Sequence, residues 1–371
     1  MGFIVSLLVV LFSLSLEEMD VLGAEKFGSH RDVLKKQTVS PIEQVEEHQV
    51  FIRVAYSELN PVDLQKLRGS PKQADQPVPS PPFVPGYGGS GIVEAVGEKA
   101  PSILKGKRVA FLADPSRRGS YATHIAVDHR LVAEIPSEKL SLRDAASVPL
   151  AGCTAYESLV KLGLQESADI SDQALLVIGG GGGVGTWAIS LARAWHPKLK
   201  IVATASSEQS KAWCLQRGAD QVVGHDDFVE KLGGGRQGSV SHILCLTEPT
   251  PAIFGGMAEV IQSYGTICLV VAGASIQNID LGFCFFKAAN VVLETVFSSI
   301  RTNYKSIVPS SEIASILNLL ATEAIKAPLS PQLEGLAESW DNALAEGGLL
   351  DALASGHVCG KLVMQIGNQG V

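Results

Sequence analysis

The sequence predicts an α/β protein with two parts, a small β-barrel-like domain and a doubly wound parallel sheet. The chain has 371 residues, which exceeds the roughly 100–200 residues expected of one domain. Short segments of β character, separated by glycine and proline, precede Ser141. Beyond Ser141, continuous apolar strands alternate with helical segments. Such alternation is typical of a parallel sheet covered by helices on both faces.

The first part of the chain shows the period-two pattern of half-buried strands. Val50, Ile52, Val54 and Tyr56 alternate with their neighbours along the chain. A loop rich in proline, glutamine and serine follows over residues 60–85. Further strands are expected at Gly91–Val96, Arg108–Leu112, Tyr121–Val127 and Leu131–Ile135. Many short strands of this kind favour a barrel-like domain.

The second part begins with helical spacing over Leu142–Leu162, interrupted by Pro149. Strands are expected at Ala174–Ile178, Lys200–Ala205, Gln221–Val223, His242–Leu246, Thr266–Val271 and Val291–Val296. Helices are expected at Val184–Trp195, Glu208–Arg217 and Ile253–Gln262. Residues Ile313–Leu353 are mainly helical in pattern, and Lys361–Gln365 is expected to return to the first domain as a terminal strand.

The amino-acid composition indicates a folded protein and excludes several classes of protein. Hydrophobic residues make up 46% of the chain and charged residues 18%, which suits folded cores and argues against disorder. The net charge is −8 and no basic run occurs, so a nucleic-acid partner is not predicted. None of the six cysteines forms a CxxC pair or has a histidine at metal-ligand spacing. We expect them to be small buried side chains in a reducing compartment.

The N-terminal run Phe3–Leu16 is apolar but shorter than a membrane-spanning helix requires. It resembles the core of a signal peptide, although no Lys or Arg precedes it. Three interpretations stay open: a cleaved or anchoring signal with possible membrane contact, an unusual first strand, or a non-native extension. The expected location is cytoplasmic, and a mature chain beginning near Glu25 would overturn it.

The stretch Gly179–Gly185 carries the main chemical signal. Gly180, Gly182 and Gly185 fit G-x-G-x-x-G between a buried strand and an amphipathic helix, which is the context the motif requires. Residues without a Cβ let the backbone approach a pyrophosphate, whose charge the helix N-terminus attracts. A glycine-rich loop without a ligand is the alternative. The stretch predicts a dinucleotide site that includes Gly183 and Val184.

The second strand of the parallel sheet indicates which dinucleotide binds. An NAD site places Asp or Glu at this strand's tip to bond the ribose hydroxyls. Here the tip carries Ala205, Ser206 and Ser207, and Lys211 lies one turn along the next helix. Ser206, Ser207 and Lys211 are candidates to bond a 2′-phosphate, although the neighbouring Glu208 opposes this and Lys211 is alternatively a solvated helix residue. The tip therefore predicts NADP(H).

Several motifs in one order resemble the medium-chain dehydrogenase/reductase superfamily, and within it the zinc-free quinone-oxidoreductase-like branch, often labelled zinc-type alcohol dehydrogenase-like. The resemblance extends over about residues 50–365. Its marks, besides the glycine turn, are NPVD (60–63), PGYGGSGIVEAVG (85–97), GKRV (106–109), GSYA (119–122), AASVPLAGCTAY (145–156), RGAD (217–220) and GKLV (360–363).

The resemblance implies a GroES-like catalytic domain of residues 31–150 and 300–371, and a Rossmann domain of residues 151–299. Residues 1–30 then form a separate apolar segment of uncertain role. The resemblance also implies that Thr154 lies near the nicotinamide, that Val270 to Gly273 face it, and that the protein is a homodimer.

Zinc is not expected, despite the family label. Zinc-dependent relatives supply a Cys where this chain has Asn60, and Gly-His-Glu where it has Gly86-Tyr87-Gly88. Asn60, Tyr87 and Gly88 do not provide the three side-chain ligands that a catalytic zinc needs. The resemblance also implies an acid where this chain has Gly88, so the identity of the proton donor is open. Tyr87 and Lys66 are the candidates. Alternatively, Tyr87 only packs in the core and Lys66 is a solvated surface residue.

The expected activity is hydride transfer from NADPH to a small molecule, either a quinone or an α,β-unsaturated carbonyl, because these acceptors need no zinc to polarise an alcohol or aldehyde oxygen. Asn60 and Asp63 would shape the cleft, and Asp63 is alternatively a loop cap. Two other functions stay open. One is a trans-acting enoyl reductase of a polyketide or fatty-acid pathway, and the other is a non-catalytic dinucleotide-binding protein.

Overall fold

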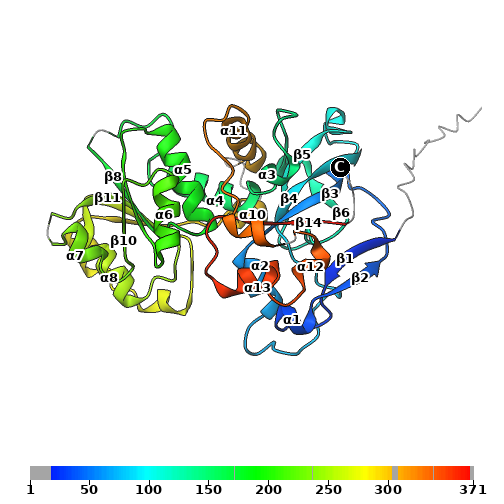
Figure 1. Ribbon diagram of the computed structural model, residues 1–371, viewed down its shortest axis with the longest axis horizontal. Coiled ribbons are helices and arrows are strands. Elements are labelled where there is room, and N and C mark those ends of the chain that lie inside the picture. The colour runs from blue at the N-terminus through cyan, green and yellow to red at the C-terminus, as the bar shows by residue number, and fades with distance from the viewer. Residues whose placement is uncertain (1–17, 171, 236, 303–307, 337, 368–371) are drawn as a thin grey trace, which may run out of the picture.

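The computed structural model describes residues 18–170, 172–235, 237–302, 308–336 and 338–367. The apolar run Phe3–Leu16 lies outside these ranges. Figure 1 shows two lobes along the longest axis, with the parallel sheet and its helices on the left and the antiparallel strands on the right. Within the described ranges, no helix is both long and apolar enough to cross a membrane. The cytoplasmic location stays a prediction.

The antiparallel lobe is built around one long strand, β3 (Gln49–Leu59). In the described part of the chain its sheet has the order β14-β3-β4-β5-β7, and β6 also pairs with β3. The other strands are β4 (Gly88–Val96), β5 (Arg108–Leu112), β6 (His124–Asp128), β7 (Val132–Glu134) and β14 (Leu362–Gln365). The terminal strand returns to the first lobe as predicted, because Leu362–Gln365 pairs antiparallel with Tyr56–Leu59.

A short sheet formed by β1 (Met19–Gly23) and β2 (Lys35–Val39) is absent from the sequence prediction. Its pairing is antiparallel, and β1 is nearly all buried, with Val21 and Leu22 at 0% exposure. Isolated bridges join Val21 to Ala122 and Ala24 to Phe83. Residues 19–24 therefore pack into the same core as the antiparallel lobe.

The parallel sheet has the order β10-β9-β8-β11-β12-β13 among the described residues, which confirms a doubly wound fold. Successive strands are added on one side of β8 up to β10 and on the other side from β11 to β13, so the switch point of the strand order lies between β8 and β11. Ligands of such sheets bind at this point, beyond the carboxyl ends of the strands. The strands are β8 (Ala174–Ile178), β9 (Lys200–Thr204), β10 (Gln221–Val223), β11 (Val240–Cys245), β12 (Ile261–Leu269) and β13 (Asn290–Leu293). Its helices are α5 (Gly183–Trp195), α6 (Glu208–Gln216), α7 (Phe228–Leu232), α8 (Pro251–Val260) and α9 (Gly282–Phe286).

Alternate residues of β8 face two separate cores. Leu175 and Val177 belong to the cluster that continues through α4 (Pro149–Lys161) into the antiparallel lobe. Leu176 and Ile178 belong to the cluster on the other face, beneath α7 and α8. The continuous apolar run of this strand thus reflects burial on both faces.

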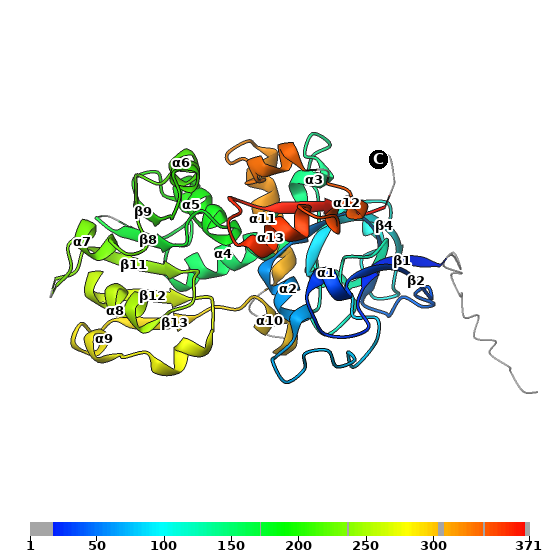
Figure 2. The ribbon, with the colours of Figure 1, turned by 60° about the horizontal axis from the view of Figure 1, so that its bottom comes forward.

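The remaining helices connect the lobes or cover the barrel. They are α1 (His30–Val33), α2 (Pro61–Arg68), α3 (Leu142–Ala145), α10 (Phe297–Thr302), α11 (Pro309–Ala321), α12 (Trp340–Ala343) and α13 (Leu349–Ser355). Short 3₁₀ turns occur at Ser102–Leu104, His129–Leu131, Ala274–Asn278 and Pro331–Gly335. In Figure 2, α4 and α10 again lie between the two lobes. Pro149 begins α4 at its first turn, where a missing N–H is tolerated.

The loop expected over residues 60–85 was wrong in part, because it contains helix α2 (Pro61–Arg68), and several predicted element boundaries were also wrong. The helix expected at Ile253–Gln262 ends at Val260, because buried Ile261 already pairs with Val240 as the start of β12. The strand expected at Tyr121–Val127 begins at His124, because the Tyr121 N–H bonds to Pro85 in a loop. The last strand of the parallel sheet ends at Leu293 rather than at Val296. The prediction that the cysteines are buried is confirmed for all six.

Candidate cofactor and catalytic site

The glycine turn joins β8 to α5 at the switch point of the parallel sheet. Gly179 has φ +85°, a conformation that strains other residues, and Gly182 is the N-cap of α5. A Cβ on Gly185 would lie 2.5 Å from Gly179 O and 2.7 Å from Gly180 Cα. The third glycine of the motif therefore permits close contact between the helix and the strand.

The outer side of the turn is open. A Cβ on Gly182 would meet, among the described residues, only Gly179 O at 3.7 Å. The first helical hydrogen bond runs from Thr186 N to Gly182 O, so the N–H groups of Gly183, Val184 and Gly185 have no acceptor within the helix. Open space in front of free N–H groups and the positive end of the helix dipole suits a pyrophosphate.

The tip of β9 presents hydroxyl groups rather than carboxylates. Ser206 is exposed, and Ser207 caps α6 by accepting a hydrogen bond from Ser210 N at 3.1 Å. Lys211 Nζ contacts Glu208 Oε1 at 2.7 Å. Both Ser207 and Lys211 thus have partners within α6, and Lys211 must leave Glu208 to reach a phosphate.

A contact not foreseen from the sequence links the turn to the neighbouring strand ends. Thr204 Oγ1 accepts a hydrogen bond from Gly179 N at 3.0 Å and lies 2.8 Å from His225 Nδ1. Burial lowers the pKa of His225, against the opposing charge of Asp226. His225 lies two residues beyond the end of β10, so these groups fix the loop conformations beside the predicted ribose site.

Three more predicted cofactor residues lie on elements next to the turn. Thr154 is buried in α4 and donates its hydroxyl to Leu150 O at 2.7 Å. Val270 directly follows β12, and its N–H bonds to Cys245 O at 3.2 Å. Gly273 lies beside Glu248, whose carboxylate a Cβ at this position would overlap. Val270 follows β12 at the carboxyl edge of the sheet, which is also the edge of the glycine turn.

Asn60 and Asp63 begin α2. Asp63 is fully buried, and its Oδ2 accepts hydrogen bonds from Asn60 N at 2.7 Å and from the Tyr121 hydroxyl at 3.0 Å. Burial raises the pKa of Asp63 to about 7, against these two hydrogen bonds, which lower it. These contacts account for Oδ2, whereas Oδ1 is buried without a hydrogen-bond partner among the described residues.

The two predicted proton donors lie in different environments. Tyr87 is 1% exposed and packs edge-on against Phe297, with 5.3 Å between ring centroids. Its hydroxyl has no hydrogen-bond partner among the described residues, and burial raises its pKa. Lys66 lies on the exposed face of α2.

Sequence reasoning missed a buried ion pair in the antiparallel lobe. Lys361 Nζ lies 3.1 Å from Glu58 Oε2, and the side chains are 3% and 0% exposed. The same ammonium donates to Leu59 O at 2.9 Å and to Asn60 Oδ1 at 2.6 Å. The signal for Lys361 was the GKLV motif, and for Glu58 a single acid in an otherwise buried strand.

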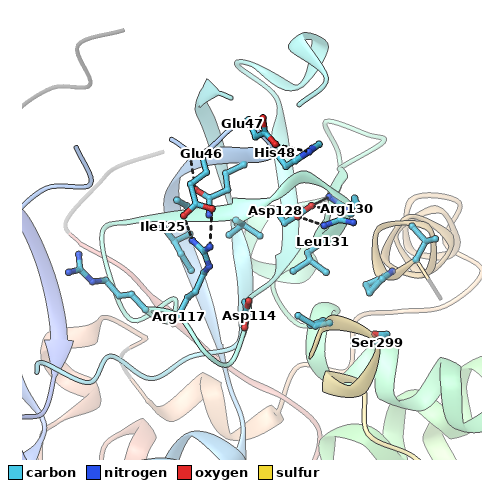
Figure 3. Close-up of a pocket in the computed structure, with 17 residues that line it drawn as sticks. Glu46, Glu47, His48, Asp114, Arg117, Ile125, Asp128, Arg130, Leu131 and Ser299 are labelled. Carbon is cyan, nitrogen blue, oxygen red and sulfur yellow. Dashed lines mark hydrogen bonds and ion pairs between the residues drawn. The ribbon is translucent and has the colours of Figure 1, made fainter. Parts of the chain in front are cut away.

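Two cavities lie away from these residues. Figure 3 shows one of about 540 Å³ in the antiparallel lobe, where Arg117 pairs with Glu46 and Arg130 with Asp128. The other, of about 690 Å³, borders Ala174, at the amino end of the parallel strands. Neither cavity is lined by a predicted site residue among those that the structure describes. Within that part of the chain there is also no group of three or more His, Cys, Asp or Glu side chains able to hold a metal ion.

A barrel-like sheet joined to a dinucleotide-type parallel sheet is the architecture of the medium-chain dehydrogenases/reductases. The family model "Alcohol dehydrogenase GroES-like domain" matches residues 46–137. A zinc-type alcohol dehydrogenase-like protein of Staphylococcus epidermidis is 32% identical over 237 residues, which are 63% of this chain and 67% of the relative.

Two further proteins extend the comparison. The chloroplastic NADPH-dependent alkenal/one oxidoreductase of Arabidopsis thaliana is 35% identical over 184 residues, 48% of this chain and 45% of that protein. The crystal structure of Escherichia coli quinone oxidoreductase complexed with NADPH has a TM-score of 0.73 and 21% identity, covering 94% of this chain and 99% of that one. The chain belongs to the medium-chain dehydrogenase/reductase superfamily, in its quinone-oxidoreductase-like branch.

Proposed function

We propose that the chain is an NADPH-dependent oxidoreductase that reduces a quinone or an α,β-unsaturated carbonyl without zinc. The observation that carries the proposal is the open face of Gly182 in front of the first turn of α5. Residues 151–299 would form the NADP(H)-binding domain, and residues 31–150 with 300–371 the catalytic domain. The relative from Arabidopsis, named for NADPH and alkenals, supports this choice of cofactor and acceptor.

The chain's own residues would bind and orient both molecules. The backbone N–H groups of Gly183, Val184 and Gly185 would hold the pyrophosphate, and Ser206 with Lys211 would receive the 2′-phosphate. The bound cofactor supplies the hydride. Two electrons and one hydrogen nucleus then reach an electron-poor carbon of the acceptor, and the negative charge moves to its oxygen. One proton from Lys66, Tyr87 or solvent completes the reduction.

The test is NADPH oxidation with a panel of ortho-quinones and conjugated enones, repeated with NADH. The proposal expects turnover with NADPH at least about tenfold more efficient than with NADH, since one phosphate contact is lost with NADH. Binding of NADPH without oxidation of any acceptor would instead identify a non-catalytic dinucleotide-binding protein. Unchanged turnover in Tyr87→Phe or in Lys66→Met would dismiss that residue as the acid.

We also propose that the protein is a homodimer. Phe283, Phe285 and Phe286 of α9 are 58%, 82% and 87% exposed, and the next strand, β13, is an edge of the parallel sheet. Exposed apolar surface beside a free strand edge favours association with a second copy. Sedimentation of the wild type and of Phe285→Ser/Phe286→Ser tests this, because a monomeric wild type contradicts it.

A further inference from the structure

We propose that Glu58 and Lys361 are positioning residues of the cofactor site, which hold Asn60 and the dinucleotide turn in fixed relation to each other. The inference rests on the proposed function, because it assumes that NADPH binds at the turn. It adds Glu58 of β3 and Lys361, the residue before β14, which no sequence motif assigned to this role.

The ammonium group of Lys361 contacts three oxygen atoms. It donates hydrogen bonds to Leu59 O at 2.9 Å and to Asn60 Oδ1 at 2.6 Å, and it lies 3.1 Å from Glu58 Oε2 as an ion pair. The amide oxygen of Asn60 accepts from Lys361, and Asn60 Nδ2 is buried without a hydrogen-bond partner among the described residues. Lys361 therefore fixes the orientation of the side chain that stands where zinc-dependent relatives place a cysteine.

The stem of Lys361 lies against the dinucleotide turn. A Cβ on Gly183, the first residue of α5, would lie 2.6 Å from Lys361 Cδ. The preceding residue, Gly360, donates its N–H to Gly181 O at 2.9 Å. One residue thus contacts the N-terminus of the cofactor helix with its methylene groups and Asn60 with its charge.

Glu58 connects the same cluster to the helix between the lobes. Its Oε1 accepts a hydrogen bond from Leu150 N in the first turn of α4, the helix that carries Thr154. Burial raises the pKa of Glu58, while the Lys361 ammonium and the Leu150 N–H lower it. The pair therefore links β3, β14, α4 and the turn before α5.

The position of the Glu58 carboxylate explains the missing acid at Gly88. A Cβ on Gly88 would overlap Glu58 Oε1 and lie 3.1 Å from Glu58 Cδ. The volume into which an acidic side chain at Gly88 would project already holds a carboxylate from the neighbouring strand. The carboxylate at this place in the structure therefore comes from Glu58 of β3.

A double substitution separates positioning from stability. Lys361→Met alone leaves a buried carboxylate without its partner, which is strongly destabilising, whereas removing both charges of a buried pair is often tolerated. In Glu58→Gln/Lys361→Met the glutamine oxygen can still accept from Leu150 N, and the methionine stem can still pack on Gly183. We expect the double variant to unfold at higher urea than Lys361→Met.

We expect NADPH binding to stay weak in the double variant, even though its stability recovers. We expect the dissociation constant for NADPH, followed by its fluorescence, to be weakened about tenfold in both Lys361→Met and the double variant. The matched control is Arg143→Met/Glu338→Gln, which neutralises a less buried pair between α3 and the C-terminal segment, and should bind NADPH as the wild type does.

Each result of these measurements either supports or overturns the positioning role of Glu58 and Lys361. A double variant that binds NADPH within about twofold of the wild type assigns the pair a structural role only and overturns the inference. If the wild type itself does not bind NADPH, the proposed function is refuted and the inference falls with it. Weak binding in a folded double variant, with the control unchanged, supports the inference.

Discussion

Two glycines of the turn, Gly182 and Gly185, should respond to the same substitution in opposite ways. In Gly185→Ala the new methyl lies 2.5–2.8 Å from three atoms of Gly179 and Gly180, all backbone. Backbone atoms cannot rotate away, so α5 must move from β8, and overpacking of this kind costs about 1–3 kcal/mol. In Gly182→Ala the methyl meets Gly179 O at an ordinary 3.7 Å, and φ −74° with ψ 175° is allowed for alanine.

The effect on ligand binding should be the reverse. The methyl of Gly182→Ala projects into the space in front of the helix N-terminus, where the pyrophosphate would approach. We expect stability within about 1 kcal/mol of the wild type and NADPH binding weakened about tenfold or more. Urea unfolding and NADPH titration of both variants measure the two effects separately. Wild-type affinity in Gly182→Ala would refute the dinucleotide site, and wild-type stability in Gly185→Ala would refute the packing argument.

Three other predictions concern specificity, pH and metals. Ser206→Asp should weaken NADPH binding about tenfold and leave NADH binding unchanged or improved, because a carboxylate at the tip of β9 repels the 2′-phosphate; an unchanged preference would contradict this. Burial, with Glu294 and Glu312, raises the pKa of Glu157 to about 9, so the folded state holds a proton that the unfolded state loses above about pH 4.5, and stability falls as pH rises between these values. Glu157→Gln should therefore increase the free energy of unfolding more at pH 8 than at pH 5 in urea titrations, and equal effects would exclude the assignment. Prolonged treatment with a zinc chelator should leave NADPH oxidation unchanged, and a loss that added zinc restores would show that the enzyme needs the metal.

Local sequence patterns predicted the strands of the parallel lobe, whereas the elements that the sequence did not predict depend on contacts between residues far apart in the chain. The strand Ala174–Ile178 was predicted with its true bounds, because a short continuous apolar run before a glycine turn has few other interpretations. The strand Met19–Gly23 was missed, because its partner strand Lys35–Val39 is mainly polar and exposed and gives no alternating pattern. Val21 is held instead by Ala122, a hundred residues away in sequence, which no local pattern reveals.

Gly88 shows that a residue missing from a motif has to be considered together with the residues packed against it. The β3–β4 ladder ends where Ser57 pairs with Gly89, and just beyond it a Cβ on Gly88 would overlap Glu58 Oε1. The β14–β3 ladder ends where Leu362 pairs with Leu59, and just beyond it Lys361 Nζ donates to Asn60 Oδ1 at 2.6 Å. Side chains opposite each other on neighbouring strands lie on one face, so a carboxylate can move from one strand to the next and fill the same volume. A missing acid is therefore a reason to inspect the residue opposite it in the adjacent strand, and in this chain that residue is Glu58, paired with Lys361.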